Sequence, residues 1–244
     1  MSQYSLDKYN LSELKKMASK MGLPARRNKG EMIQDISKAF SEYEEYKKEK
    51  IDKYTRHGQL GEKGKEGTTF LVTDKYGKEY AMKTFRSGKS SATLYKEYSL
   101  QKKAVKAGVA PRVYDYDTVG KWILMEKMDK HLYEKIDEEK GILSKKDQER
   151  IIEIFNKLDD VGVFHNDANI CNYMIKDGTI YMIDYGFAKE ITPNLKKKLG
   201  TDRPNSRLMI IGLILKFKER KLPKTSYKYL VRNVSEEDRC KFGL

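Results

Sequence analysis

The sequence predicts an α+β protein with two unequal lobes, preceded by a small all-helical module. Three observations predict this class. The first forty residues show helical periodicity, short β-branched and aromatic runs begin at about Gly58, and a long helical pattern and a late hairpin follow them. We therefore expect a helical module over residues 1–41, a helical linker over 42–57, and a larger domain over 58–244 whose lobes are 58–127 and 128–244.

The bulk composition is that of a water-soluble globular protein, with 39% apolar and 35% charged residues. The longest apolar run, Leu208–Leu215, is too short to cross a bilayer, so no membrane association is expected. The first residues show no secretory signal pattern. Cys171 and Cys240 lie far apart, which favours a reducing compartment in the cytoplasm or nucleus over a disulfide framework.

The chain is strongly basic, with a net charge of +14 from 50 Lys and Arg against 36 Asp and Glu. The excess is uneven, because the last segment, residues 196–244, holds 14 basic and 5 acidic side chains, a net of +9. Such a field attracts phosphate-rich partners, including DNA, RNA, phosphoproteins and acidic peptides. A lysine-rich solvated surface without a dedicated partner is the alternative.

Two helices are expected within the first forty residues. Asn10 and Glu13 form a capping-box pattern before the first helix, and Gly22 ends it. Asn28 and Glu31 repeat the start pattern before the second helix. The expected apolar stripes are Leu11, Leu14, Ala18 and Met21 on the first helix and Ile33, Ile36 and Phe40 on the second.

The segment from Leu11 to Ile36 resembles the SAP module and, nearly as well, the N-terminal module of Rho-type termination factors. Both are small helical folds that bind nucleic acid, so the resemblance implies a DNA or RNA partner. Arg26, Arg27 and Lys29 would lie in the turn and at the start of the second helix, where charge and backbone N–H groups can face a phosphate. The alternative is a helical pair that only packs against its neighbour.

Alternating strand and helix patterns are expected after Gly58, with a turn at Asp177-Gly178. The helix over 144–161 carries a buried stripe of Ile151, Ile154, Phe155 and Leu158. The expected strands are Thr69–Thr73, Glu79–Thr84, Trp122–Met125 and Thr179–Ile183, and a further helix covers Thr93–Lys106.

A glycine-rich segment from Gly61 to Val72 is a candidate phosphate cradle. Gly61, Gly64 and Gly67 would let backbone N–H groups approach phosphate oxygens without a Cβ in the way. Its spacing differs from G-x-G-x-x-G, because the first glycine lies one residue early. An ordinary hairpin turn is the alternative.

Lys83 ends an apolar strand sixteen residues after Gly67, where its ammonium could reach the α- and β-phosphates of a nucleotide. Glu97, fourteen residues further on, lies in a helical stretch and could pair with it. Gly88-Lys89-Ser90 is not interpreted as a P-loop, because Lys83 stands where the first P-loop glycine is required.

The most specific pattern runs from His165 to Asn172, as His-Asn-Asp-Ala-Asn-Ile-Cys-Asn, and Asp184-Tyr185-Gly186 begins twelve residues later. H-x-D-x-x-x-x-N followed by D-F/Y-G, each flanked by apolar strand, resembles the protein-kinase-like superfamily. The resemblance covers Gly58 to about Lys189 and implies a two-lobed kinase-like fold that uses ATP and Mg²⁺. The chain after Gly186 is short, and in this respect it is similar to RIO-type and other reduced kinases.

The resemblance assigns a role to each matching position. Asp167 would be the catalytic base that aligns the acceptor hydroxyl. Lys83 would contact the nucleotide phosphates, and Glu97 would pair with Lys83. His165 would be structural. The implied magnesium ligands are Asn172 and Asp184, and the adenine would lie beside Met125 and the backbone of Glu126 and Met128.

Several positions depart from the protein-kinase pattern. Asn166 replaces the usual arginine before the catalytic Asp, and Asn169 replaces a lysine that helps to neutralise the transferring phosphate. No A-P-E follows the D-Y-G, and Arg207 and Gly212 stand at the ends of the place where D-x-W-S-x-G would open the next helix. A reduced C-terminal lobe without the usual peptide platform is therefore expected.

The sequence predicts an ATP- and Mg²⁺-dependent serine/threonine protein kinase that its N-terminal module targets to nucleic acid. Its composition, with 17 Tyr and one Trp, suggests a viral or reduced genome and, if viral, a place in the virion. The protein substrate is not identified. The alternatives are a small-molecule or nucleotide phosphotransferase with a kinase-like fold, and a pseudokinase scaffold bound to nucleic acid.

Overall fold

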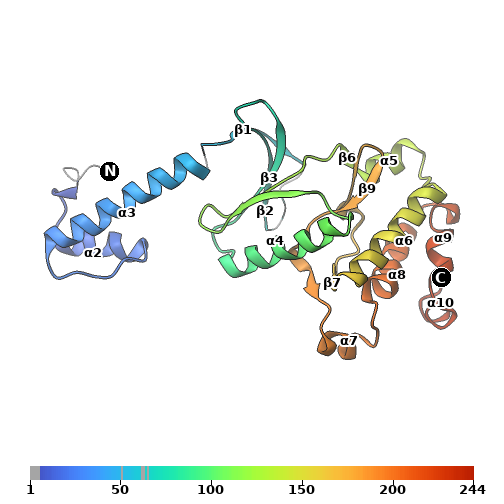
Figure 1. Cartoon of the computed structure of the whole chain (residues 1–244). Coiled ribbons are helices and arrows are strands. Elements are labelled where there is room, and N and C mark those ends of the chain that lie inside the picture. Colours follow the sequence, from blue (N-terminus) through green and yellow to red (C-terminus); the bar gives the residue numbers. More distant parts are fainter. Residues whose placement is uncertain (1–5, 51, 62–63, 65) are drawn as a thin grey trace. The chain divides into compact units, whose positions relative to one another are not determined.

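The structure is a computed structural model that describes residues 6–50, 52–61, 64 and 66–244 (Figure 1). The chain divides into two compact units, one of Met1–Thr55 with Asp74–Gly77 and one of Arg56–Thr73 with Lys78–Leu244. Residues 1–5 of the predicted module lie outside the described residues, as do Glu62, Lys63 and Lys65 of the glycine-rich segment.

The first unit contains α2 (Leu11–Lys20) and α3 (Lys29–Lys50). The predicted capping box is present, because the Glu13 N–H donates to Asn10 Oδ1 at 3.0 Å and the Asn10 N–H donates to Glu13 Oε2 at 2.8 Å. Both apolar stripes pack together, which gives this unit its own small core. The buried members of that core are Leu6, Leu14, Ala18, Met32, Ile33 and Ile36.

The linker predicted for residues 42–57 begins as a helix. Its first part continues α3 as one helix to Lys50, and strand β1 already begins at Thr55, three residues before the predicted start of the larger domain. The sequence of β1, Thr-Arg-His-Gly-Gln-Leu, has little apolar content because the strand is mostly exposed. Periodicity therefore could not reveal it.

The second unit begins with a five-stranded sheet in the order β1-β2-β3-β5-β4 within the described residues. The contacts β2–β3, β3–β5 and β4–β5 are antiparallel. Helix α4 (Ser91–Lys106) packs Leu94 against Phe85 and Ile123 of the sheet. The strands are β1 (Thr55–Leu60), β2 (Gly67–Thr73), β3 (Glu79–Phe85), β4 (Val113–Asp117) and β5 (Trp122–Met125).

The rest of the second unit is mainly helical. Its small sheets are one of three strands in the order β6-β8-β9 and one that pairs β7 with β10. The predicted stripe on α6 is confirmed, because all four of its residues are fully buried. The elements are β6 (Lys130–His131), α5 (Leu132–Glu138), α6 (Lys145–Asp160), β7 (Val163–Phe164), η1 (Ile170–Asn172), β8 (Tyr173–Lys176), β9 (Thr179–Met182), η2 (Tyr185–Phe187) and β10 (Lys189–Glu190).

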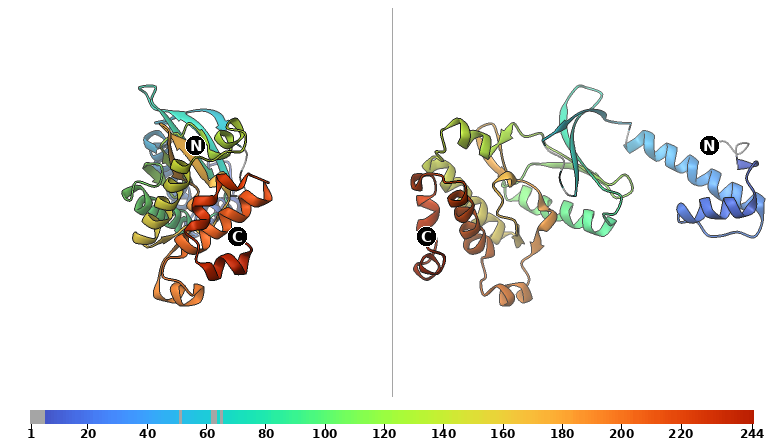
Figure 2. Two further views of the ribbon diagram at one scale, coloured as in Figure 1. Left: turned by 90° about the vertical axis from the view of Figure 1, so that its right-hand side faces the viewer. Right: turned by 180° about the vertical axis from the view of Figure 1, so that it is seen from behind.

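The C-terminal segment completes this helical part. Helix α8 is the most buried of its helices, and α9 lies beside α6, where the Tyr229 N–H donates to Gln148 Oε1 at 2.9 Å (Figure 2). None of the described helices is long and apolar enough to span a membrane. The elements are α7 (Pro193–Leu199), η3 (Asn205–Met209), α8 (Ile210–Glu219), η4 (Lys224–Ser226), α9 (Lys228–Arg232) and α10 (Glu236–Phe242).

Candidate active site

The end of the glycine-rich segment lies against strand β3. Gly67 faces Phe85 across the β2–β3 ladder, and a Cβ on Gly67 would lie only 2.2 Å from the Thr84 carbonyl oxygen. Gly67 is thus required by the close approach of two backbones, a reason separate from phosphate binding. Gly61 has a φ of +67° and ends β1 in a turn, and Gly64 lies between these two glycines in the connection to β2.

Lys83 lies between two carboxylates. Its Nζ donates to Glu97 Oε1 at 2.7 Å, which confirms the predicted contact, and to Asp184 Oδ1 at 2.8 Å. Burial alone would lower the pKa of Lys83, but the two carboxylates outweigh it and hold that pKa above its ordinary value. Burial likewise would raise the pKa of Asp184, and the Lys83 ammonium outweighs this, so the pKa is lowered. Both groups are therefore charged at neutral pH.

A second lysine reaches the same glutamate. Lys89 Nζ donates to Glu97 Oε2 at 2.5 Å and to Glu66 Oε2 at 2.8 Å. Neither Lys89 nor Glu66 was among the predicted site residues. Lys89 precedes the start of α4 and Glu97 lies within it, so no helical spacing in the sequence indicated their contact. Five charged side chains thus form one connected chain of contacts.

The β8–β9 hairpin brings the two predicted magnesium ligands to one place. Its turn residues Asp177 and Gly178 both have positive φ, as the predicted turn requires. Tyr173 pairs with Met182, and the Ile183 N–H donates to the Asn172 carbonyl at 2.8 Å. The spacing of twelve residues between Asn172 and Asp184 is therefore the length of one tight hairpin.

Asp167 lies in the loop between β7 and η1, where it contacts Asn172. Asn172 Nδ2 donates to Asp167 Oδ2 at 2.8 Å, and the Asn169 N–H donates to Asp167 Oδ1 at 3.2 Å. Asn169, which stands where kinases carry a lysine, caps η1 by accepting from the Cys171 N–H at 3.1 Å. These bonds orient the Asp167 carboxylate from within its own loop.

His165 is fully buried beneath this loop. Its Nε2 lies 2.9 Å from the Ile183 carbonyl oxygen, and because a carbonyl can only accept, Nε2 carries the proton. Burial lowers the pKa of His165, and the hydrogen bond to Ile183 opposes this only in part. A neutral, buried imidazole joined to the residue before Asp184 fits the structural role expected for it.

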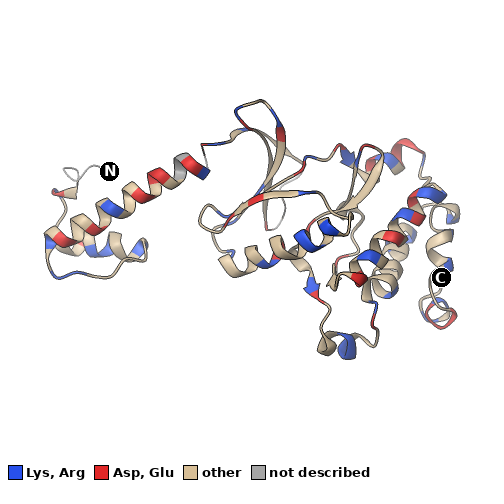
Figure 3. Cartoon of the chain, in the orientation of Figure 1, with Lys and Arg blue, Asp and Glu red and all other residues tan. Residues whose placement is uncertain are grey.

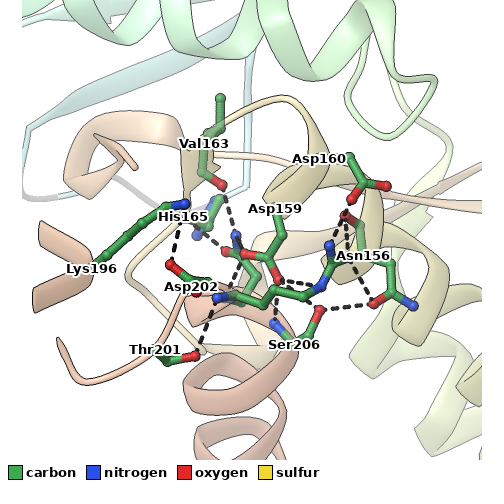
Figure 4. A network of polar contacts seen from close by, with 11 residues as sticks. Asn156, Asp159, Asp160, Val163, His165, Lys196, Thr201, Asp202 and Ser206 are labelled. Carbon is green, nitrogen blue, oxygen red and sulfur yellow. Dashed lines mark hydrogen bonds and ion pairs between the residues drawn. The ribbon is translucent and has the colours of Figure 1, made fainter. Parts of the chain in front are cut away.

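A buried polar network holds the same loop from the other side (Figure 4). Asn205 Oδ1 accepts from the His165 N–H at 3.0 Å, and Asn205 Nδ2 donates to Asp159 Oδ1 and to the Val163 carbonyl, both at 2.7 Å. Asp159 also accepts from the Ser206 hydroxyl at 2.6 Å. Asn205 thus links helix α6 to the loop that carries Asp167.

Asn205 was not among the predicted site residues, since Arg207 and Gly212 were the positions that the sequence pattern singled out in this region. Arg207 instead pairs with Asp238 at 2.7 Å. Gly212 has a packing role, since a Cβ there would lie 2.8 Å from the Cβ of Ala168, the residue after Asp167. The missing side chain lets α8 approach this loop closely.

The predicted adenine residues lie at the end of β5 and just after it. Met125 pairs with Ala81 of β3 and with Val113 of β4, and Met128 is buried. The Glu126 N–H donates to the Arg112 carbonyl at 2.8 Å. Of the backbone groups of Glu126, the carbonyl is therefore the one suited to contact a base.

Tyr185, the middle residue of the D-Y-G, carries a buried hydroxyl that lacks a hydrogen-bond partner within the described residues. Burial also raises its pKa, so the phenol stays neutral. We expect Tyr185→Phe to raise the free energy of unfolding by about 1 kcal/mol, because an unsatisfied polar group is removed. The edge-to-face ring contact with His165 at 4.9 Å is retained.

Denaturant unfolding of the purified variant measures this change. Tyr76→Phe is the matched control, because Tyr76 is 82% exposed and its hydroxyl is in water. A loss of stability in Tyr185→Phe would instead show that the hydroxyl binds an ordered water.

The basic residues of the first unit are partly engaged within it. Arg26 pairs with Asp35 at 2.8 Å, and Lys29 Nζ donates to the Asp7 carbonyl at 2.8 Å. Arg27 is exposed. The structure therefore brings the three predicted residues to one end of the helical pair, with two of them also holding that end together.

The residues present fit magnesium and ATP. Asn172 Nδ2 is bonded to Asp167, so its Oδ1 is the atom that can face a cation, and Asp184 adds an ionised carboxylate oxygen. Hard oxygen donors are the ligands that Mg²⁺ prefers. Lys83 supplies a charged ammonium beside them for phosphate oxygens.

No family model matches the chain. It is similar to the KEOPS complex subunit Bud32 of Pyrococcus abyssi (strain GE5 / Orsay), with 27% identity over 169 residues that cover 65% of this chain and 69% of that relative. This similarity and the mixed architecture of helices and antiparallel sheets support an α+β fold of the protein-kinase-like superfamily.

Proposed function

We propose that the chain is an ATP- and Mg²⁺-dependent phosphotransferase that acts on serine or threonine hydroxyls of a protein. The observation that carries this proposal is the position of Lys83 Nζ, 2.7 Å from Glu97 and 2.8 Å from Asp184. A paired lysine beside a potential metal-binding carboxylate is what phosphoryl transfer needs to hold nucleotide phosphates.

Each of these residues has a defined task in the proposed reaction. Bound Mg²⁺ would supply positive charge against the phosphates. Asn172 and Asp184 would hold the ion, and Lys83 would donate to phosphate oxygens while Glu97 keeps it in place. Asp167 would accept the proton of the attacking hydroxyl, in a loop that neutral His165 and Asn205 keep rigid.

Labelled ATP with Mg²⁺ and three acceptors tests this function. The acceptors are a basic protein, an acidic protein and an aminoglycoside. Label on serine or threonine of either protein supports the proposal. Label on the aminoglycoside alone favours the small-molecule phosphotransferase, and nucleotide binding without transfer to any acceptor favours the pseudokinase scaffold.

We also propose that the chain binds DNA or RNA through its first unit. The support is the resemblance of residues 11–36 to the SAP module and the cluster of Arg26, Arg27 and Lys29 at one end of α2 and α3. The rival site is the lysine run 196–198 on α7, where Figure 3 colours the ribbon blue for Lys and Arg.

Replacing Arg26, Arg27 and Lys29 together by Gln is expected to weaken binding to a short duplex by roughly tenfold. The slope of log affinity against log salt concentration should fall by the share of about three phosphate contacts. The matched control replaces Lys196, Lys197 and Lys198 by Gln, which removes the same three charges from the net of +14. Fluorescence titrations at several salt concentrations compare the two variants. A larger loss of affinity in the control would show that α7 is the binding site. No binding by the parent at low salt would contradict the proposal that the chain binds nucleic acid.

A further inference from the structure

Lys89 lies in a turn that joins strand β3 to helix α4. The Lys89 N–H donates to the Arg86 carbonyl at 3.0 Å, and the Arg86 N–H donates to the Glu66 carbonyl at 3.1 Å. These bonds keep the turn beside the residue that precedes β2. Ser90 then caps α4 by accepting from the Thr93 N–H at 3.1 Å. The position of Lys89 is thus set by backbone contacts on both of its sides.

The Lys89 side chain is largely buried, with 7% of its surface exposed. Its Nζ contacts Glu66 and Glu97, at 2.8 and 2.5 Å, and lies 4.2 Å from the centre of the Phe85 ring. An ammonium taken out of water is costly unless it is paired. Two carboxylates and an aromatic face stabilise the charge here.

The charges of the site explain what this lysine can do. Glu97 has two carboxylate oxygens, of which Oε1 accepts from Lys83 and Oε2 from Lys89. The connected groups are three carboxylates and two ammoniums, a net of −1. Without Lys89 the net would be −2, and Lys83 would be the one cation among these groups against three anions.

We propose that Lys89 is a positioning residue of the phosphate site. Lys89 neutralises Glu97, so that the charge of Lys83 is available to bind the nucleotide phosphates. The inference rests on the proposed function. It also bears on Asn169, since the positive charge that kinases carry at that place is absent here. Lys89, which lies between β3 and α4, places a second ammonium on Glu97. It makes the site less negative from a different part of the fold than Asn169.

Lys89→Met, which keeps the length of the side chain and removes the charge, is expected to weaken Mg·ATP binding by roughly tenfold or more, because a unit charge is lost from a partly buried site. Lys89→Arg should restore most of the affinity. Lys106→Met is the matched control, because Lys106 is exposed on the same helix α4. Titration with a fluorescent ATP analogue and the shift of the melting temperature on adding Mg·ATP are the two measurements.

Glu66→Gln separates this electrostatic role from a merely structural one. It removes a carboxylate and keeps Lys89, so nucleotide should bind at least as tightly as to the parent. If Lys89 only held the fold together, Glu66→Gln would weaken binding as Lys89→Met does. The sign of the Glu66→Gln effect decides the question even if Lys89→Met folds poorly.

Unchanged affinity in Lys89→Met, or weaker binding in Glu66→Gln, would overturn the inference while leaving the proposed function in place. A parent protein that does not bind Mg·ATP would instead remove the proposed function and the inference with it. These two failures are distinguished by the parent titration, which is made first.

Discussion

Asp167→Asn is expected to lower the rate of phosphoryl transfer by roughly 10²- to 10⁴-fold while leaving the affinity for Mg·ATP nearly unchanged. An amide cannot accept the hydroxyl proton as a carboxylate does. Its oxygen can still accept from Asn172 Nδ2, the 2.8 Å bond that orients this side chain. The loop geometry is therefore largely kept, and the loss falls on the chemical step.

Single-turnover transfer and nucleotide titration on the same protein sample check this result. Asp177→Asn is the matched control, because Asp177 lies exposed in the β8–β9 turn and Asn tolerates its φ of +48°. Transfer at the parent rate would mean that Asp167 takes no part in catalysis. An equal fall in nucleotide affinity would show that its role is to hold Asn172.

Asp184→Asn is expected to abolish Mg²⁺-dependent nucleotide binding and, with it, turnover. The ion would lose its one ionised ligand among the two predicted residues, and the 2.8 Å contact with Lys83 would no longer be an ion pair. Asn is preferred to Ala here because Asp184 has a φ of +62°, a left-handed conformation that Asn adopts more readily. The substitution thus removes charge with little change of backbone.

Nucleotide titrations with and without Mg²⁺ measure this effect, and the melting temperature without nucleotide confirms folding. Asp202→Asn serves as the control, because Asp202 is exposed at 82% and forms a surface ion pair with Lys196 at 3.3 Å. Parent-like dependence on Mg²⁺ in Asp184→Asn would place the metal site elsewhere.

The local elements were predictable because their causes act over few residues. The capping box of Asn10 and Glu13, the stripe on α6 and the turn at Asp177-Gly178 all appear where the sequence predicted them. Helical periodicity, caps and turn residues depend on neighbours within one or two turns of the chain. Strand β1 was missed because it is exposed and has no apolar alternation.

The candidate site was predictable only where its residues belong to a motif. Asp167, Asn172 and Asp184 share one loop and one hairpin, so their order along the chain already implies that they lie close together. Their roles remain proposals that the two substitutions above will test. Lys89 was not predicted as a site residue once Gly88-Lys89-Ser90 was rejected as a P-loop, and Asn205 was not predicted either. Lys89 nevertheless contacts Glu97, and Asn205 contacts His165.

By itself the sequence predicted a helical module ahead of a larger domain, the helices and the hairpin, and the order of the proposed site residues along the chain. Only the tertiary structure decided that Glu66, Lys89 and Asn205 join them. The reason is the distance along the chain, since Lys83 meets Asp184 across 101 residues, Asn205 meets His165 across 40, and Lys89 meets Glu66 across 23. Such contacts form when the lobes and their loops pack, and no local pattern of residue types encodes them.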